Sequence, residues 1–443
     1  MKLIGFMMLG CLLLSGTTSA DWLKAMQAYE QQDYATANAE FVKLIPLGNE
    51  TAAFNLGAMW YQGEGVEADP VKAMAYFMLA DELGHEQASD ILLRLQAQAS
   101  EASLMQARTQ YRQWLALVEV PAKRVYQLEE SQEYPEPVRR VNPRYPLEAA
   151  QRGLFGYVNL RFLVDETGRV QVVDTIDAYP KNVFERSAVQ AVKRWRYQPS
   201  EQKHVMRVQL SYSLEGVSIK PMRLAEIIEE HRLWDYAVAG SPSHQLVLGT
   251  LLRLGEIQSH NNLSVDKSLP LAIGPDFSVF EPRSRLRAGF DGFFGRATVR
   301  VDESGTITEQ LSATIAAESD ITDLVGLSLS GKVEHDVYYI YRTADMRSRR
   351  PSVSATFEVP KTLSARFWWE QAARNGNKDA QRMMAAYDEH WEAYLLAELD
   401  AEVMAWKATR MILEGQKEAG GKLLEQAIAG NNAVAKALKK QLL

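Results

Sequence analysis

The residues from 143 to 214 change their hydrophobic period twice, which limits the folds that this chain can adopt. From Tyr157 to Val164 apolar side chains occupy every second position, a pattern typical of a half-buried strand. One face carries Val158, Leu160, Phe162 and Val164, and the other carries Tyr157, Asn159 and Arg161. The sequence Asp165-Glu166-Thr167-Gly168 favours a hairpin turn, so 169–176 is predicted to be the returning strand.

After the hairpin the period becomes that of a helix. One helical face, which ends before Pro199, carries Phe184, Ala188, Ala191, Val192 and Trp195. A last alternation predicts a third strand, with Met206, Val208, Leu210, Tyr212 and Leu214 on one face. The predicted order is therefore β-β-α-β.

This order and these residues resemble the C-terminal domain of TonB-type energy transducers. The residues that carry the resemblance are spread over the whole stretch: Pro143, Tyr145, Pro146, Gly153, Gly156, Asp165, Gly168, Trp195 and Pro199. The resemblance covers about one sixth of the 443 residues, so it does not describe the whole protein.

The resemblance implies a mode of binding. In TonB-type domains a short extended segment of an outer-membrane receptor adds as a strand to the sheet, and main-chain hydrogen bonds supply the affinity. The candidate peptide-binding strand is then the last one, with Arg207, Val208, Gln209, Leu210, Ser211 and Tyr212. The alternative is that this strand pairs within the protein and that its edge is covered.

Two other parts of the chain have a helical pattern with small residues at close spacing. Residues 53–88 and 363–386 resemble Sel-type, tetratricopeptide-like repeats, which implies pairs of antiparallel helices joined by glycine-containing turns. Such repeats stack into solenoids that present concave surfaces to protein partners.

The remaining segments complete a predicted α+β multidomain chain. Its parts are a signal peptide (1–20), helical Sel/TPR-like repeats (21–119), a linker (120–137), the TonB C-terminal-like β-β-α-β domain (138–217), a helical segment (218–265), a β-rich region (270–360) and helical repeats (361–443). A hairpin predicted at 297–308 repeats the Asp-Glu-x-Gly turn of the first hairpin. Such hairpins recur by chance, and the alternative is a degenerate second copy of the TonB-like domain.

The N-terminus predicts export. Lys2, an apolar run over 3–14 and Thr18-Ser19-Ala20 are typical of a secretory signal that is cleaved before Asp21. We therefore expect a periplasmic protein whose membrane contact is indirect. The alternatives are an uncleaved N-terminus that anchors the chain in the inner membrane, and lipidation of Cys11.

The composition and the scattered polar residues argue against several classes of protein. A net charge of −7 without a basic cluster does not favour nucleic-acid binding. The seven histidines show no metal-ligand spacing, and no Gly-x-Ser-x-Gly elbow occurs, so we expect no metal, cofactor or catalytic residue. Ser241-Pro242-Ser243-His244 is predicted to be a loop.

Taken together, the sequence favours a non-enzymatic interaction protein of the cell envelope. Its partner is expected to be a protein, with an outer-membrane receptor as one candidate. One alternative is a TonB-type energy transducer for receptor-dependent transport. A second alternative is an envelope enzyme with a site in the β-rich region, between Phe277 and Pro360.

Overall fold

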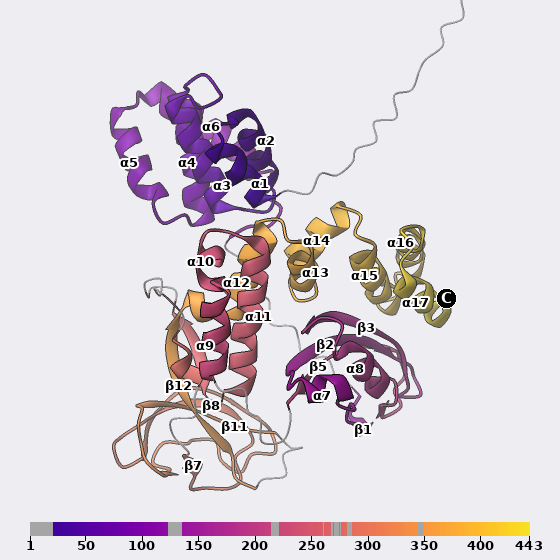
Figure 1. Cartoon of the computed structure of the whole chain (residues 1–443). Coiled ribbons are helices and arrows are strands. Elements are labelled where there is room, and N and C mark those ends of the chain that lie inside the picture. The colour runs from indigo at the N-terminus through magenta and orange to yellow at the C-terminus, as the bar shows by residue number, and fades with distance from the viewer. Residues whose placement is uncertain are drawn as a thin grey trace, which may run out of the picture. The chain divides into compact units, whose positions relative to one another are not determined.

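The computed structural model describes residues 21–122, 135–213, 221–259, 261–266, 269, 274, 276–280, 286–343 and 349–443 (Figure 1). The chain divides into two compact units, of which the first ends at Val118 and the second begins at Glu119. The predicted signal peptide, Cys11 and most of the predicted linker lie outside the described residues.

The first unit is helical, as predicted. Its helices are α1 (Trp22–Glu30), α2 (Tyr34–Leu44), α3 (Glu50–Gln62), α4 (Pro70–Leu83), α5 (Ala88–Gln98) and α6 (Glu101–Leu115). Gly63 ends α3 in the left-handed region, and Asp69 caps α4 through hydrogen bonds from the backbone of Val71 and Lys72.

Residues 137–213 of the second unit form a small α/β domain, named the central domain below. Its elements are β1 (Pro137–Arg139), α7 (Leu147–Gln151), β2 (Gly156–Val164), β3 (Val170–Tyr179), α8 (Glu185–Val192), β4 (Arg196–Tyr197) and β5 (His204–Tyr212). The predicted β-β-α-β order is thus present, with β1, α7 and β4 in addition. The sheet is antiparallel in the order β3-β2-β5, and β4 pairs with β1.

The face of this sheet that carries Val158, Leu160 and Phe162 packs on α8. Val158, Leu160 and Phe162 lie in one apolar core with residues of α8 such as Ala188 and Val192. The ring of Trp195 meets Phe162 edge to face, with 6.2 Å between ring centroids. The alternation of the strands and the helical face therefore enclose a common core.

The prediction of a half-buried strand was wrong for the second face of the sheet, which carries Tyr157, Asn159 and Arg161. Every residue of β2 is buried, including Tyr157, Asn159 and Arg161. Tyr157 belongs to an apolar core with α11 (Pro242–Gln258), and Leu163 belongs to another with α15 (Ala401–Leu413). Helices from distant parts of the chain therefore cover the face that a period of two would leave to solvent.

The rest of the second unit contains further helices and a second sheet. The helices are α9 (Pro221–Glu230), α10 (Leu233–Val238), α11, α12 (Ala365–Arg374), α13 (Lys378–Ala385), α14 (Glu389–Ala397), α15, α16 (Lys417–Ala429) and α17 (Ala433–Leu442). The strands are β6 (Asn262–Asp266), β7 (Arg287–Ala288), β8 (Gly295–Val301), β9 (Ile307–Ile315), β10 (Leu329–Ser330), β11 (Val337–Arg342) and β12 (Ser352–Pro360). Short 3-10 turns occur at Phe277–Phe280 and Lys361–Leu363.

Several local predictions in this region were confirmed and one was wrong. The hairpin predicted at 297–308 is β8–β9, and β11 and β12 lie in the region that was predicted to be β-rich. Ser241-Pro242-Ser243-His244 is not a loop, because Ser241 occupies the N-cap position and Pro242 the first turn of α11. The large sheet has the order β6-β12-β11-β8-β9.

Replacing Gly168 by alanine is expected to destabilise the central domain. Gly168 has φ +77°, and an added Cβ would lie 2.0 Å from the carbonyl oxygen of Tyr197. We expect the free energy of opening of β2, measured by native-state hydrogen exchange, to fall by about 3 kcal/mol or more.

Gly153 supplies the matched control. It also has positive φ (+60°), but no atom lies within 4 Å of an added Cβ. In the Gly153→Ala variant the free energy of opening should therefore fall by only about 1 kcal/mol, which is the cost of placing alanine in the left-handed region. Equal losses in both variants would contradict the close approach of the turn to Tyr197.

Candidate functional site

The last strand of the central domain lies at an edge of its sheet. β5 pairs with β2 along its whole length, and in the described part of the chain no strand pairs with its other side. Arg207 and Ser211 are exposed, and Val208, Gln209 and Leu210 are half-buried. The geometry of β5 is therefore that of a strand to which another strand can be added.

Hydrogen bonds across the hairpin show which backbone groups of β2 point to β5. The Asp165 N–H donates to the Arg169 carbonyl (2.9 Å), so the backbone of Asp165 points to β3. Both irregularities of the β2–β3 register place an extra residue in β3, and β2 itself alternates without interruption. Because successive residues of a strand bond to opposite neighbours, Val164 and every second residue before it point to β5.

The register then identifies the groups at the open edge. Val164 and every second residue before it are opposite one set of β5 residues: His204, Met206, Val208, Leu210 and Tyr212. The backbone groups of this set therefore point to β2. The residues between them, whose N–H and C=O groups point to the open edge, are Val205, Arg207, Gln209 and Ser211. The edge thus offers regularly spaced donors and acceptors for an added strand.

The side chains of β5 separate into two rows. Met206, Val208 and Leu210 pack only partly against the core shared with α8. On the other row, the Arg207 guanidinium lies 5.1 Å from the Tyr387 ring centroid, and Gln209 accepts a hydrogen bond from Arg253 (3.2 Å). An added strand would meet an apolar row on one face and a polar, cationic row on the other.

Several predicted signature residues shape the start of the domain. The Tyr145 hydroxyl donates to the Leu154 carbonyl, and its ring meets Phe184 edge to face. Pro146 occupies the N-cap position of α7, and Gly153 follows this helix with positive φ. An added Cβ at Gly156 would lie 1.7 Å from the Tyr179 carbonyl oxygen.

The other signature residues hold the turn and the return to β5. Asp165 Oδ1 accepts hydrogen bonds from the backbone of Thr167 and of Arg169 (both 2.9 Å). Trp195 Nε1 donates to the Val141 carbonyl (2.9 Å), whereas Pro143 is half-buried and Pro199 is exposed. The signature thus builds the domain, and the candidate peptide-binding residues lie on a different element.

Hydrogen bonds oppose burial at the Asp165 carboxyl. Burial raises its pKa, but bonds from the side chains of Thr167 and Gln171 and from the backbone outweigh this effect, so the pKa lies below its ordinary value. The ionised carboxylate is therefore the form that holds the turn.

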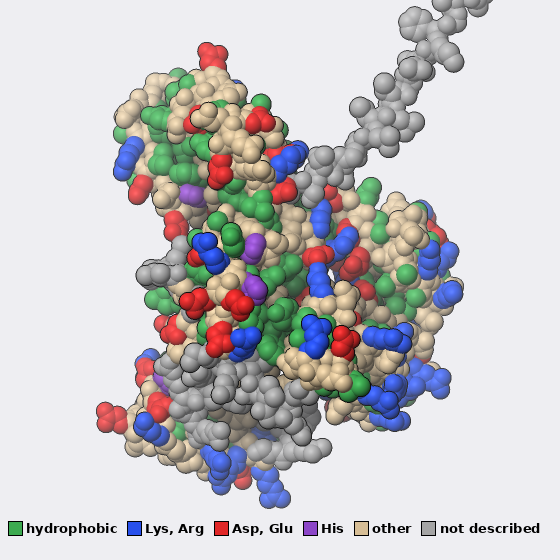
Figure 2. All heavy atoms as spheres, in the orientation of Figure 1, with side chains coloured by type: hydrophobic (Ala, Val, Ile, Leu, Met, Phe, Trp, Pro, Cys, Tyr) green, Lys and Arg blue, Asp and Glu red, His purple; other side chains and the backbone are tan. Residues whose placement is uncertain are grey.

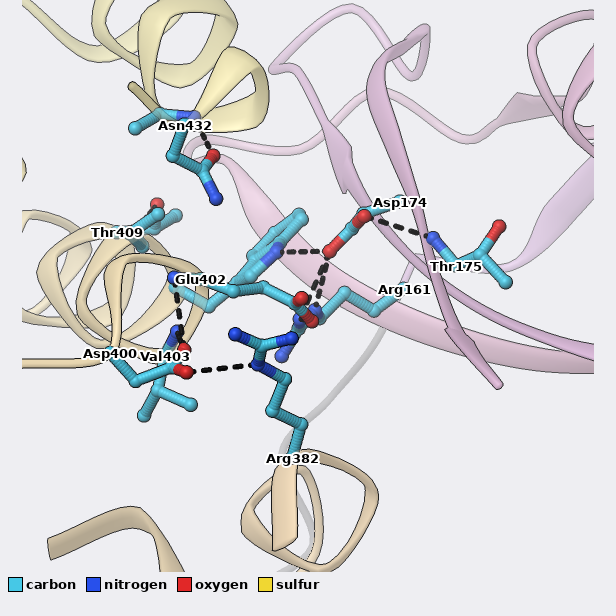
Figure 3. A network of polar contacts seen from close by, with 12 residues as sticks. Arg161, Asp174, Thr175, Arg382, Asp400, Glu402, Val403, Thr409 and Asn432 are labelled. Carbon is cyan, nitrogen blue, oxygen red and sulfur yellow. Dashed lines mark hydrogen bonds and ion pairs between the residues drawn. The ribbon is translucent and has the colours of Figure 1, made fainter. Parts of the chain in front are cut away.

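A buried ionic network joins the second face of the sheet to α15 (Figure 3). Arg161 Nη2 lies 2.9 Å from Asp174 Oδ2 and 2.8 Å from Glu402 Oε1. Trp406 Nε1 donates to the same Asp174 oxygen (2.7 Å), and the Arg161 guanidinium lies 4.8 Å from the Trp406 ring centroid. Sequence reasoning missed this site because its residues come from distant segments and form no local motif.

A second ion pair fixes the start of α15. Asp400 Oδ1 caps the helix by accepting hydrogen bonds from the backbone of Glu402 and Val403 (both 3.1 Å). Its other oxygen pairs with Arg382 Nε of α13 (2.8 Å). The first turn of α15, which carries Glu402, is therefore held on both sides.

A cavity of about 430 Å³ lies beside the opposite edge of the sheet. It is lined by Thr175 to Tyr179 of β3 and by residues of α11 and α13. Two carboxyl groups in its lining are half-buried, and burial raises the pKa of Asp177 and the pKa of Glu402, although Arg161 opposes the second shift. The cavity therefore combines apolar walls with two carboxyl groups of raised pKa.

The central domain differs in charge from the rest of the chain. Residues 137–213 hold thirteen Lys and Arg against seven Asp and Glu, whereas the whole chain has a net charge of −7. Figure 2 shows basic side chains gathered on the side where β1 lies in Figure 1. The exposed basic residues of this domain include Arg139, Arg140, Arg144 and Arg152. Such a surface favours the approach of acidic partners.

Other kinds of site have little support in the described residues. No group of three or more His, Cys, Asp or Glu is placed to hold a metal ion. The helices of the described segments are all too short or too polar to cross a membrane. The cavity lies outside the segment between Phe277 and Pro360 in which an enzyme site was considered.

Comparison with known proteins identifies one part of the chain. Residues 141–215 match the family described as "Gram-negative bacterial TonB protein C-terminal", so the chain contains a TonB C-terminal domain, which is a non-catalytic module. Protein TonB of Klebsiella pneumoniae is 34% identical over 85 residues, which are 19% of this chain and 35% of that protein. Protein TonB of Escherichia coli K12 is 33% identical over 84 residues, again 19% and 35%.

Among solved structures, the TonB C-terminal domain of Pseudomonas aeruginosa is 27% identical, with a TM-score of 0.18. The alignment covers 20% of this chain and 95% of that one. The chain spans about a third of the length of the curated relatives that it matches. The Sel-type likeness of the helical parts is matched by no family model and stays a prediction.

The packing of α15 on the sheet is expected to strengthen as the pH falls. Glu402 has a raised pKa in the folded protein, so its stabilising contribution is complete below its ordinary pKa and is lost as the pH rises through the folded value. After correction for the intrinsic rate, hydrogen exchange of α15 should therefore slow as the pH falls from neutral toward the ordinary pKa of a glutamate.

The Glu402→Gln variant tests this assignment. Its side chain cannot ionise and is similar in size, so the part of the pH dependence that comes from Glu402 should disappear. An unchanged pH profile in the variant would show that another group, such as Asp177, is responsible.

Proposed function

We propose that the chain is a periplasmic, non-enzymatic interaction protein whose TonB C-terminal domain binds an extended segment of a cell-envelope partner. The partner segment adds as a strand to β5. The observation that carries this proposal is the row of backbone groups of Val205, Arg207, Gln209 and Ser211 at the edge of the sheet.

The match to the TonB family supports the class of partner. The relatives are proteins named TonB, and strand addition by an outer-membrane receptor is the mode of binding that the resemblance implies. The basic surface of the central domain adds electrostatic attraction for an acidic segment, so association should slow as the salt concentration rises.

The covered second face restricts where a partner can bind. α11 and α15 bury that face, and α8 covers the first one. A partner therefore meets this sheet at an edge. The helical segments 21–119 and 361–443, if they are Sel-type repeats, add separate surfaces for other proteins.

A TonB-type energy transducer is the alternative function. It requires an N-terminus that stays in the inner membrane, whereas a cleaved signal peptide places the chain free in the periplasm. Fractionation with intact-mass analysis separates the two: a mature chain that begins at Asp21 supports the interaction protein, and a retained Met1 in the inner membrane supports the transducer.

Substitution of Gln209 by proline should prevent strand addition. Gln209 N–H points to the open edge, so proline removes a donor for the partner while the ladder to β2 stays intact. We expect the affinity for periplasmic N-terminal peptides of outer-membrane receptors to fall about tenfold or more, the equivalent of one or two hydrogen bonds.

Gln209→Ala is the matched control, since it removes the same side chain but keeps the backbone N–H. Its affinity should stay within about twofold of that of the unchanged protein. Isothermal titration calorimetry measures the affinities of the unchanged protein and of both variants. Equal losses in both variants would assign binding to the side chain, and no loss in either would place the partner elsewhere.

A further inference from the structure

The two sheets of the second unit contain hairpins with the same turn. In the central domain the Asp165 N–H donates to the Arg169 carbonyl, and Asp165 Oδ1 accepts from the backbone of Thr167 and Arg169. In the other sheet the Asp302 N–H donates to the Thr306 carbonyl (3.0 Å). Asp302 Oδ1 accepts from the backbone of Ser304 (2.9 Å) and of Thr306 (3.0 Å).

The likeness extends to the strand that follows. The Tyr197 N–H donates to the carbonyl of Gly168 (2.8 Å), and the Leu329 N–H donates in the same way to Gly305 (2.7 Å). Tyr197 lies in the short strand β4, and Leu329 lies in the short strand β10. Each pairs antiparallel with a short strand that precedes the hairpin: β4 with β1, and β10 with β7. A recurring turn alone does not require this second set of bonds.

The strand order and register also agree. The sheets contain the antiparallel orders β3-β2-β5 and β9-β8-β11, and in both the register irregularities place the extra residues in the returning strand. The separation in sequence from Tyr197 to His204 equals that from Leu329 to Asp336. His204 is opposite Val164, and the Asp336 carbonyl accepts from the N–H of Val301.

The two regions differ in what covers the first face. The central domain has α8 between its hairpin and β4, whereas residues 316–327 contain no helix. Leu324 of that segment is fully buried in the core of the large sheet, together with Val299 and Ile340. A loop therefore replaces the helix while an apolar core is kept.

They differ again at the edge. β11, the counterpart of β5, pairs antiparallel with β12. Tyr338 and Ile340 of β11 are fully buried, whereas Met206 and Val208 at the corresponding positions of β5 are half-buried. In the large sheet, β12 thus covers the edge of β11, whereas the corresponding edge of β5 in the central domain is open.

We propose that residues 286–342 are a second, degenerate copy of the TonB C-terminal domain, whose partner edge is filled by β12. We further propose that the open edge of β5 binds an extended segment with the side-chain pattern of β12. This second part rests on the strand addition proposed above, and it specifies the chemistry of the partner.

The contacts of β12 define this pattern. Val353 is opposite Ile340 and Ala355 is opposite Tyr338, so apolar side chains extend the core row of the sheet. Ser352, Ser354 and Thr356 alternate with them. In a segment added to β5, the apolar side chains would cover Met206, Val208 and Leu210. The side chains between them would lie beside Arg207 and Arg253, and this position favours hydroxyl or acidic side chains in the partner.

The probe is a synthetic peptide with the sequence of 352–360, added to the full chain and followed by residue-resolved hydrogen exchange. Without peptide, the amides of Tyr339 and Tyr341 should be protected by β12, and those of Gln209 and Ser211 should exchange fast. With millimolar peptide, exchange at Gln209 and Ser211 should slow about tenfold, as expected for newly formed backbone hydrogen bonds.

A control peptide replaces the residues that correspond to Val353, Ala355 and Phe357 by serine. Protection of β5 by the native sequence alone supports the proposal, and equal protection by both peptides overturns the apolar pattern. No protection of β5, or displacement of β12 from β11, overturns the proposed equivalence of the two edges. Because no receptor is present, this result is independent of whether receptor peptides bind.

Discussion

The buried guanidinium of Arg161 is the interaction on which the arrangement of the second unit depends. Arg161 is 6% exposed and lies between the carboxylates of Asp174 and Glu402. Removing an ion from water costs several kcal/mol unless charged partners compensate for it. Arg161 is paired with Asp174 within the sheet, and α15 completes its surroundings with Glu402 and Trp406, which makes the contact between helix and sheet specific.

This contact determines how the TonB C-terminal domain can be used. With α8 on one face and the distant helices on the other, the sheet has only its edges left for a partner. The edge at β5 carries outward backbone groups and a half-exposed apolar row. In the proposed second copy β12 already occupies the corresponding edge, so one chain contains an open and a filled version of the same surface.

Local sequence predicted the parts of the fold that depend on short-range physics. The alternation in β2, the Asp165 turn and the Phe184–Trp195 face are each determined by neighbouring residues, and all three are present. The short strands β4, β7 and β10 were not predicted, because one or two pairing residues produce no period. The candidate strand β5 was also predicted from local pattern, but whether its edge is open depends on what the rest of the chain places beside it.

The sequence by itself therefore determined the β-β-α-β domain and its turn chemistry, and it predicted the strand to which a partner would be added. Only the tertiary structure decided that the second face of the sheet is buried, that Arg161 is shared by Asp174 and Glu402, and that β12 fills the edge of the other sheet. The physical reason is that a period of two separates the two faces of a strand but does not say what covers each face. That depends on contacts between residues more than two hundred positions apart, such as Arg161 and Glu402.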